Sequence, residues 1–463
     1  MMESFSLLHS IRISALVLSV TSALDPHELT IIILSQSEGY HVAHADLLKN
    51  DIQEQARSMD KGIPNVILTH NLDIKGSWTF VPLLPYMIAQ YSQSKWFFFC
   101  EDNTVIRLPL LINFLSSLNY TQEQWLGHAL YDREPTIIHH FAEHTKKFKY
   151  PNVASGFAIS AELVHSLANK IVKGEGPNND FSIDASYEFS SFILSSSKKR
   201  LIHAPELCVV SSRDCATYPR YFHPCTNPVP REKVFIAVKT CSKYHLERIP
   251  IIKQTWGKYA SNIGYFTDKT DKNLPDAYVV PNTEQGHCAK TFAILEIAHK
   301  LMQKQSLDWL IITDDDTILG LARLLRLLTC YNPANPVALG ERYGFRMWHN
   351  AQGYDYLTGG AGLALSASIV QQILESGLCH CPSPSSPDDM FIFGICISRL
   401  GVKPTQCSLF HQARPLDYAL AYLASNEPVS FHKFWMIDPI KVYEQWFAES
   451  DSIYAKNNMH TEL

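Results

Sequence analysis

Three consecutive carboxylates follow an apolar run in the stretch DWLIITDDDTILG. Asp314, Asp315 and Asp316 come one residue after the run Trp309–Ile312. Adjacent carboxylates repel one another, and each raises the pKa of its neighbours unless a cation compensates them. Oxygen ligands suit Mg²⁺ or Mn²⁺. The triplet therefore predicts a site for a divalent metal ion.

Two other interpretations of the acids need to be weighed. Acidic residues are favoured at a helix N-terminus, and TILGLARLLRLL has helical spacing, but this does not explain three acids behind an apolar strand. Phosphatases of the haloacid dehalogenase type carry the pattern D-x-D-x-T/V after a strand. Here Ile318 stands at the last position of that pattern, and Thr317 comes one place early. The remaining interpretation is the D-x-D site of a nucleotide-sugar glycosyltransferase, in which the metal ion bridges the diphosphate.

The segment that precedes the acids alternates between strand and helix patterns. Short apolar runs at Val234–Val238, Ile263–Asp268 and Trp309–Thr313 predict strands, and CAKTFAILEIAHKLMQKQ predicts an amphipathic helix. This alternation indicates an α/β fold with a mostly parallel sheet. Ligands of such sheets bind at the carboxyl ends of the strands, which is where the acids lie.

The chain contains a second, weaker copy of this pattern. KWFFFCEDNTVI around Trp96 resembles DWLIITDDDTIL, and ASGFAISAELV resembles GAGLALSASIV. We therefore expect two tandem domains of one fold, at residues 28–225 and 232–445. The boundary falls near CTNPVPREK, where prolines and charges separate the copies.

Both ends of the chain indicate the secretory pathway. Arg12, an apolar run and small residues predict a signal peptide at residues 1–23. The final residues HTEL, 460–463, are similar to the KDEL and HDEL retrieval signals. Eleven cysteines, odd in number, favour disulfides over zinc, with at least one free thiol. We expect the endoplasmic reticulum lumen as location and, after signal cleavage, no stable membrane span.

The net charge is -5, without a long basic run. Proteins that bind nucleic acid usually carry a basic patch or stripe. We therefore expect no nucleic acid partner.

Several motifs of the second copy occur in an order typical of one enzyme family. VFIAVKT, YFTD, WLIITDDDT, LGERYG, TGGAGLALS and PDDMFIFG follow one another between Lys233 and Asp438. In this the chain resembles the Fringe-like β-1,3-glycosyltransferases. The resemblance implies two tandem GT-A-like (Rossmann-like) domains, of which the second is catalytic.

The two-copy layout and the tail narrow the implied activity. Together with these features, the resemblance implies an inverting enzyme that transfers glucose from UDP-glucose to the 3-hydroxyl of O-linked fucose on thrombospondin type 1 repeats, with Mn²⁺ or another divalent cation. A sibling β-1,3-galactosyl- or N-acetylglucosaminyltransferase is the nearest alternative. An inactive, lectin-like binding protein is the alternative from another class.

The resemblance also assigns roles to single residues. It implies that Asp316 binds the metal ion, and that Asp314 and Asp315 help to hold the ribose or the metal. His411 in LFHQ is the implied histidine ligand, and His432 in SFHKFW competes with it. By the same resemblance, further donor-binding residues are Val238, Lys239, Thr240, Arg248, Asp268, Gly359 and Gly360, and Gly340–Arg342 borders the donor sugar or the acceptor.

The acidic pair of PDDM supplies the implied catalytic base. Inversion needs one carboxylate, opposite the leaving diphosphate, that accepts the proton of the acceptor hydroxyl. The resemblance favours Asp389 for this role, and Asp388 is then the N-cap of the following helix.

The first copy departs from the motifs. Glu101-Asp102-Asn103 lacks the third acid, VFIAVKT has no good equivalent near LTIIILSQS, and Asp184 matches the base only approximately. We expect the first domain to be non-catalytic, as an acceptor-binding or scaffolding unit.

Overall fold

The computed structural model describes residues 24–142, 148–283, 285–347 and 352–459. The predicted signal peptide at 1–23 and the retrieval-like tail at 460–463 lie outside the described residues. Within the described part of the chain, no helix has the length and apolar character needed to cross a membrane.

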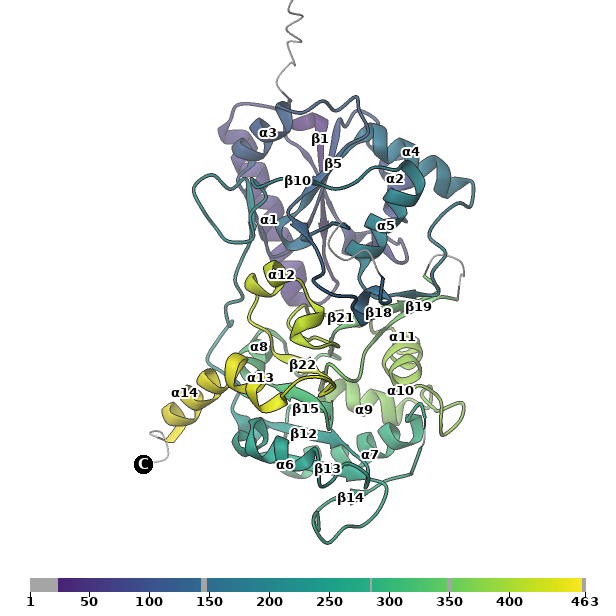
Figure 1. The fold of residues 1–463 in the computed structure, drawn as a ribbon, viewed down its shortest axis with the longest axis vertical. Helices are drawn as coiled ribbons and strands as arrows, with labels where there is room; N and C mark the ends of the chain where they lie inside the picture. Colours follow the sequence, from purple (N-terminus) through teal and green to yellow (C-terminus); the bar gives the residue numbers. More distant parts are fainter. Residues whose placement is uncertain (1–23, 143–147, 284, 348–351, 460–463) are drawn as a thin grey trace, which may run out of the picture.

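Two large sheets, one in each half of the chain, form the framework (Figure 1). The first has the order β10-β5-β8-β3-β1-β2, with strands β1 (Leu29–Leu34), β2 (Asn65–Leu68), β3 (Trp96–Glu101), β5 (Trp125–Gly127), β8 (Phe157–Ser160) and β10 (Ile202–His203). The second has the order β14-β13-β12-β15-β20-β17-β21, with strands β12 (Val234–Lys239), β13 (Asn262–Thr267), β14 (Tyr278–Val279), β15 (Trp309–Asp314), β17 (Ala338–Gly340), β20 (Leu363–Ser366) and β21 (Thr405–Gln406).

The two sheets have the same pairing pattern. In the first, β1 is parallel to β2 and β3, β8 is antiparallel to β3 and β5, and β10 is parallel to β5. In the second, β12, β13, β15, β20, β17 and β21 repeat these relations in the same order. This confirms the predicted fold class of two tandem α/β domains. It also corrects the expectation for LTIIILSQS, because β1 is the counterpart of β12.

Helices cover both faces of each sheet. The first domain has α1 (Gly39–Ser58), α2 (Leu83–Gln90), α3 (Leu108–Ser116), α4 (Ala161–Val172) and α5 (Ala185–Ser197). The second has α6 (Ile249–Gln254), α7 (Cys288–Gln305), α8 (Leu321–Leu327), α9 (Ala367–Glu375), α10 (Asp388–Met390), α11 (Ile397–Arg399), α12 (Leu420–Ala424), α13 (Pro439–Trp446) and α14 (Ala448–Met459).

Central strands are apolar on both faces because helices pack on both sides. In β15 the side chains of Trp309 and Ile311 join one core cluster, and those of Leu310 and Ile312 join the opposite one. In β3, likewise, the side chains of Trp96 and Phe98 join one cluster, and those of Phe97 and Phe99 join the opposite one. Such sandwiching explains why these strands read as continuous apolar runs rather than alternating ones.

The second half continues beyond residue 445, the predicted end of the catalytic domain. Asp451 of α14 accepts hydrogen bonds from the Ala322 backbone N–H at 2.7 Å and from the Tyr443 hydroxyl at 2.9 Å. The Asp451 carboxylate therefore fastens α14 to the start of α8 and to α13.

A short antiparallel pair follows the central acids in each copy. β4 (Thr104–Ile106) pairs with β11 (Thr217–Pro219), and β16 (Thr317–Leu319) pairs with β22 (Ser430–His432). Because β16 separates Asp314–Asp316 from α8, these acids do not lie at a helix N-terminus. The helix-dipole interpretation of the triplet is therefore wrong.

The domains contact each other through backbone and side-chain pairing. β9 (Phe181–Ser182) of the first domain adds to the hairpin of β18 (Arg342–Phe345) and β19 (Tyr354–Leu357) in the second. The Gln36 side chain also exchanges two hydrogen bonds, of 2.9 and 2.7 Å, with the Gln406 backbone. In Figure 1 the hairpin of β18 and β19 lies on the side of the second domain that faces the first.

The cysteines form disulfides, as predicted. The four pairs are Cys208–Cys215, Cys225–Cys330, Cys288–Cys381 and Cys379–Cys396, and Cys100, Cys241 and Cys407 remain as thiols. Cys379 and Cys381 thus belong to two different disulfides, which leaves the Cys-His-Cys segment without thiolates for zinc.

Candidate active site at the carboxyl end of the second sheet

The turn between β15 and β16 presents the three aspartates at the carboxyl end of the second sheet. Asp314 ends β15 and lies opposite Lys239, the last residue of the neighbouring strand β12. The Lys239 ammonium lies 3.0 Å from the Asp314 carboxylate and 3.1 Å from that of Asp388. This lysine therefore ties the acid triplet to the segment of the implied base.

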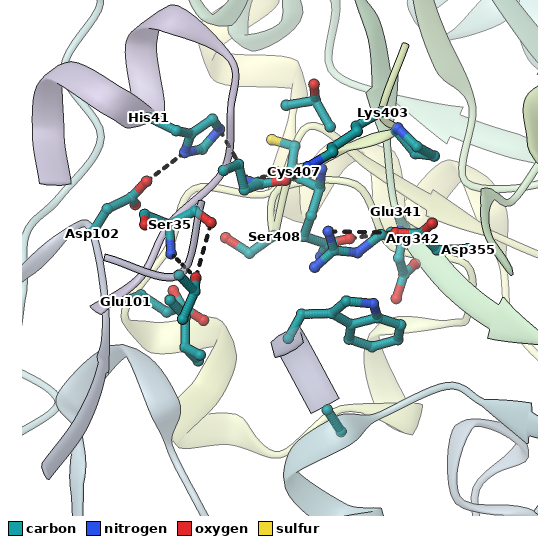
Figure 2. A pocket seen from close by; sticks show the side chains of 18 of the residues that line it. Ser35, His41, Glu101, Asp102, Glu341, Arg342, Asp355, Lys403, Cys407 and Ser408 are labelled. Atoms are coloured by element: carbon teal, nitrogen blue, oxygen red, sulfur yellow. Dashed lines mark hydrogen bonds and ion pairs between the residues drawn. The ribbon is translucent and has the colours of Figure 1, made fainter. Parts of the chain in front are cut away.

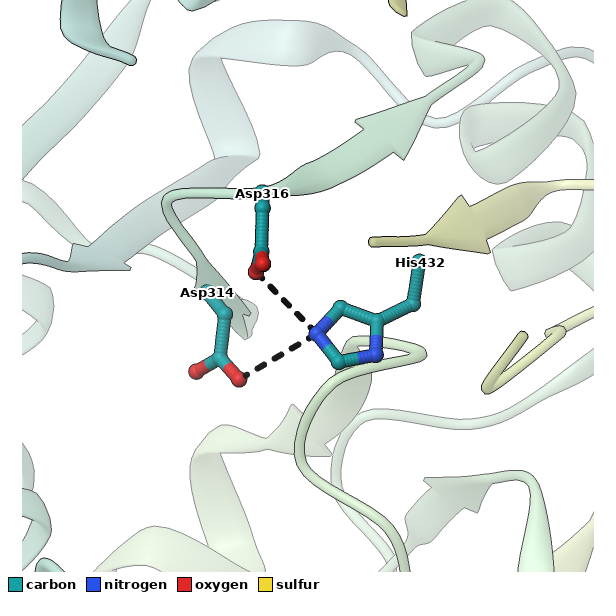
Figure 3. A group of neighbouring side chains, drawn as sticks. All are labelled: Asp314, Asp316 and His432. Atoms are coloured by element: carbon teal, nitrogen blue, oxygen red, sulfur yellow. Dashed lines mark hydrogen bonds and ion pairs between the residues drawn. The ribbon is translucent and has the colours of Figure 1, made fainter. Parts of the chain in front are cut away.

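Asp314, Asp316 and His432 form a group that could hold a metal ion (Figure 3). One ligand atom from each lies within 4.8 Å of the others. His432 Nε2 is 3.1 Å from Asp316 and 3.7 Å from Asp314. Burial alone would lower the pKa of His432, but the two carboxylates outweigh it and raise that pKa. Two carboxylates and an imidazole are a ligand set that could hold a divalent metal ion.

His411, the histidine assigned first from the resemblance, is not in this group. It is fully enclosed, and its Nδ1 lies 3.1 Å from both the Leu409 and the Ser430 carbonyl oxygens. Burial lowers the pKa of His411 to about 4. The ring packs against the aromatic rings of Tyr418 and Phe431. The structure therefore brings His432, and not the predicted His411, to the two aspartates.

Strand pairing explains why His432 reaches the acids. His432 lies opposite Thr317 in the β16–β22 pair, and Thr317 directly follows Asp316. The register therefore sets the imidazole beside the turn. From the sequence, His432 in SFHKFW was only the competing candidate for the histidine ligand.

The Asp315 side chain points away from this group and toward Thr240, which directly follows β12. It accepts hydrogen bonds from the Thr240 hydroxyl at 2.7 Å and from the Arg248 guanidinium at 2.5 Å. Arg248 also lies 3.1 Å from Asp316 and over the Tyr244 ring. The structure thus brings Thr240 and Arg248 to the triplet, where the guanidinium could also contact a phosphate.

Asp388 does not cap the following helix, contrary to prediction. Its carboxylate accepts a hydrogen bond from the Thr291 hydroxyl at 2.5 Å and pairs with Lys239. The residue before α10 is Pro387, and no side-chain cap is formed there. Sequence reasoning missed Thr291, which carries no motif of its own.

Asp389 remains available for proton transfer. Within the described residues, its carboxylate accepts one hydrogen bond, from the Met390 backbone N–H at 2.8 Å. Burial first, and then the charge of Asp388, raise the pKa of Asp389 to about 6. A carboxylate with this pKa is ionised at pH 7 and more basic than an exposed one, which suits a general base.

The TGGAG loop owes its glycines to close approaches. A Cβ at Gly360 would lie 2.3 Å from the His432 ring, and one at Gly359 would lie 3.3 Å from Lys239 Nζ. Thr317 donates a hydrogen bond to the Gly360 carbonyl at 2.9 Å. The loop thus leaves space for the imidazole and the ammonium.

Replacing Gly360 with alanine should displace the His432 ring. Loss of a group that orients a metal ligand typically weakens metal binding about 10–100-fold, and we expect a loss of this size for Mn²⁺, measured by electron paramagnetic resonance. Gly176→Ala is the control, because a Cβ there meets no atom within 4 Å. Equal Mn²⁺ affinity in both variants would contradict the inference that Gly360 leaves space for His432 as a metal ligand.

The other predicted donor residues lie around the same strand ends. Val238 is buried within β12. Asp268 follows β13 and accepts hydrogen bonds from the Ser242 backbone at 2.6 Å and hydroxyl at 3.1 Å. Glu341 accepts a hydrogen bond from the Gln412 N–H, and Arg342 lies over the Trp78 ring of the first domain. Arg342 thus belongs to the boundary between the domains.

The first copy lacks the groups of this site. Its β4–β11 pair places Pro219 opposite Thr104, where the second copy has His432. Asp184, the approximate match of the base, caps α5 and lies 3.0 Å from His139. The first copy therefore has a proline at the position of His432 and a histidine-paired carboxylate at the position of the base.

A family profile and the sequences of individual relatives point to the same family. A family profile described as Fringe-like matches residues 14–200 and 229–458. The chain is 44% identical over 442 residues to a β-1,3-glucosyltransferase of Mus musculus, covering 93% of this chain and 89% of the relative. The corresponding protein of Homo sapiens is also 44% identical, with coverage of 94% and 87%.

More distant proteins match only part of the chain. The β-1,3-N-acetylglucosaminyltransferase lunatic fringe of Bos taurus is 28% identical over 209 residues, covering 41% of this chain and 55% of its own. Among solved structures, a glycosyltransferase involved in glycosylation of the major capsid of PBCV-1 has a TM-score of 0.27 at 11% identity, covering 41% and 93% of the two chains.

Proposed function

This chain belongs to the Fringe-like family, and from that premise we propose that it transfers glucose from UDP-glucose to O-linked fucose on thrombospondin type 1 repeats, in β-1,3 linkage and with inversion. One observation carries the proposal: the identity of 44% with β-1,3-glucosyltransferases extends over 93% of the chain and thus over both domains. By contrast, the match to lunatic fringe of Bos taurus covers only 41% of this chain.

Asp389 would accept the proton of the acceptor hydroxyl. As this proton leaves, the hydroxyl oxygen forms the new bond to the anomeric carbon, and the bond from that carbon to the diphosphate breaks on the opposite face. The raised pKa of Asp389 and its unbridged position support this role. Lys239 holds Asp388 beside it and so positions the base segment.

Asp314, Asp316 and His432 would hold the divalent cation, which we propose to be Mn²⁺. When bound, it would neutralise charge on the departing diphosphate. Arg248 lies next to the same acids and would add a fixed positive charge on the nucleotide side.

The chain would act in the endoplasmic reticulum lumen. Four disulfides fit an oxidising compartment. We propose that the first domain is non-catalytic. Pro219 and Asn103 stand where the second copy has the candidate metal ligands His432 and Asp316.

A donor panel tests the proposed reaction. The chain is incubated with a fucosylated thrombospondin repeat, Mn²⁺ and UDP-glucose, UDP-galactose or UDP-N-acetylglucosamine, and the product mass is measured. We expect one hexose to be added from UDP-glucose and at least roughly tenfold slower transfer from UDP-galactose. The two sugars differ only at one hydroxyl, and a site whose polar groups bind that hydroxyl rejects the sugar in which it is misplaced.

Two outcomes would contradict the proposal. Preferred transfer from another donor would indicate one of the sibling enzymes. Binding of the repeat without release of UDP from any donor, with or without EDTA, would indicate a lectin-like protein.

A further inference from the structure

A three-stranded sheet joins the two domains next to the candidate base. Its order is β19-β18-β9, and the first domain contributes β9. Phe345 of β18 lies opposite Phe181 of β9 and opposite Tyr354 of β19. The ring centroids of Phe181 and Phe345 are 5.1 Å apart, and those of Phe345 and Tyr354 are 5.8 Å apart. A row of three aromatic rings therefore runs from the first domain to β19, and cross-strand pairs of this kind stabilise sheets.

The far end of this row lies against the segment of the candidate base. α10, which contains Asp389, and the following segment Phe391–Cys396 both contact β19. A Cβ at Gly394 would lie 2.8 Å from Tyr356 Cβ and 3.1 Å from Tyr354 Cδ2. Burial first, and then the charge of Asp389, raise the pKa of both tyrosines. Tyr354 and Tyr356 therefore form a wall beside Asp389.

The hairpin of β18 and β19 borders open space on another side. A cavity of about 1220 Å³ lies between the domains, and Arg342, Tyr354 and Asp355 of the hairpin line it. Figure 2 shows Arg342 and Asp355 on one side of this cavity and Asp102 of the first domain on the other. Segments with few packing contacts open locally at low cost. Pairing with β9 therefore supplies support that the cavity side does not give.

Both ends of β18 are held by the first domain. The Arg346 N–H donates a hydrogen bond to the Asp180 carbonyl at 2.6 Å, and Arg346 Nε lies 3.1 Å from the Asp180 carboxylate. At the other end, the Arg342 guanidinium lies over the Trp78 ring, 4.6 Å from its centroid. The hairpin is thus fastened along the whole length of β18.

β9 itself is anchored inside the first domain. Asp184, two residues after β9, caps α5 and lies 3.0 Å from Nε2 of the buried His139. His139 Nδ1 lies 2.6 Å from the buried Asp132, and the Glu188 carboxylate accepts a hydrogen bond from the Ile183 N–H at 2.6 Å. In the second copy the corresponding segment carries the base. The first copy therefore uses this segment as a support.

We propose that Phe181 is a positioning residue for Asp389. The first domain supplies β9, the row of rings extends its support to Tyr354, and Tyr354 keeps the base segment in place. No residue of the first domain has to touch the reacting atoms. The inference rests on the proposed function, in which Asp389 accepts the proton of the acceptor. Because a displacement of about 1 Å can lower a rate about 10²-fold, a support at this distance affects turnover.

The variant Phe181→Ala removes the first ring of the row, which is 39% exposed. We expect kcat for glucosyl transfer to fall about three- to tenfold, the fold-change that corresponds to one aromatic pair. Mn²⁺ affinity and the number of Mn²⁺ ions bound per chain should stay unchanged, which shows that the chain is folded. Phe181→Tyr keeps the ring and should keep kcat. Leu47→Ala removes an exposed apolar side chain from α1 of the first domain and is the control with unchanged kcat.

A double-mutant cycle shows whether Phe181 acts through Tyr354. In Tyr354→Ala the row is already broken beside Asp389, so adding Phe181→Ala should cost little further kcat. Two independent sites would instead give the product of the two separate losses. Such a product, or an unchanged kcat in Phe181→Ala, would overturn the inference. A loss of kcat in proportion to a loss of bound Mn²⁺ would overturn it too, because Phe181 would then only stabilise the fold.

Hydrogen exchange tests the support without relying on any reaction. In Phe181→Ala, the backbone amides of β19 and of residues 388–396 should exchange faster than in the parent, while those of β15 and β16 at the metal group keep their rates. Unchanged exchange in β19 would reject the support even if the chain transfers glucose. Faster exchange together with a parent that transfers no sugar would reject the proposed reaction, and the support of the hairpin by β9 would stand.

Discussion

Replacing Asp389 with asparagine is expected to lower kcat by roughly 10²–10⁴-fold, the usual contribution of a general base. Asparagine keeps an oxygen that can accept the hydrogen bond of the Met390 N–H, so the segment should stay in place while its basicity is lost. The measurement is the rate of glucosyl transfer at saturating donor. Asp276→Asn, at an exposed aspartate, is the matched control.

The pH profile gives a second measure of the same residue. The pKa of Asp389 is raised to about 6 in the folded chain, and a base must be deprotonated to act. Transfer should therefore fall as the pH drops through about 6 and recover above it. This acidic limb should be absent from the residual activity of Asp389→Asn. Unchanged kcat, or an unchanged acidic limb in the variant, would place the base elsewhere.

Replacing His432 with alanine should weaken Mn²⁺ binding by about 100-fold or more. Even outer-shell partners of metal ligands typically contribute about 10–100-fold to affinity, and His432 lies 3.1 Å from Asp316. Mn²⁺ affinity is measured by electron paramagnetic resonance, together with transfer at rising Mn²⁺ concentration. EDTA should abolish transfer by the parent chain.

His411→Ala is the matched control for this experiment. His411 was the first assignment by resemblance, but it is enclosed by aromatic rings and backbone carbonyls. Its loss should lower the melting temperature, because a buried ring is removed, and leave Mn²⁺ affinity nearly unchanged. The reverse pattern, with Mn²⁺ binding lost only in His411→Ala, would reject the Asp314, Asp316 and His432 group.

Features that depend on neighbouring residues could be predicted from the chain. The run Trp309–Ile312 is apolar at every position because helices cover both sides of β15, and this marks a central strand. Asp314–Asp316 follows immediately, so its place at a strand end needed no long-range information. Repetition of the pattern around Trp96 indicated the second domain for the same reason.

Features that depend on distant segments could not be predicted in the same way. His411 and His432 are both buried histidines near the end of the second copy, and local sequence does not distinguish them. Only the register of β16 against β22 decides which imidazole meets Asp316. Likewise, the use of Asp388 by Lys239 and Thr291 requires β12, α7 and α10 to converge.

By itself, the sequence determined the family, the repeated α/β fold and the strand end that carries the acids. These features depend on periodicity and motif order, which can be recognised from contiguous residues. Tertiary structure alone decided the histidine of the metal group, the partner of Asp388 and the cavity between the domains. The physical reason is that each of these is set by pairing between elements that fold together from far apart in the chain. Their side-chain geometry exists only once the sheets have formed.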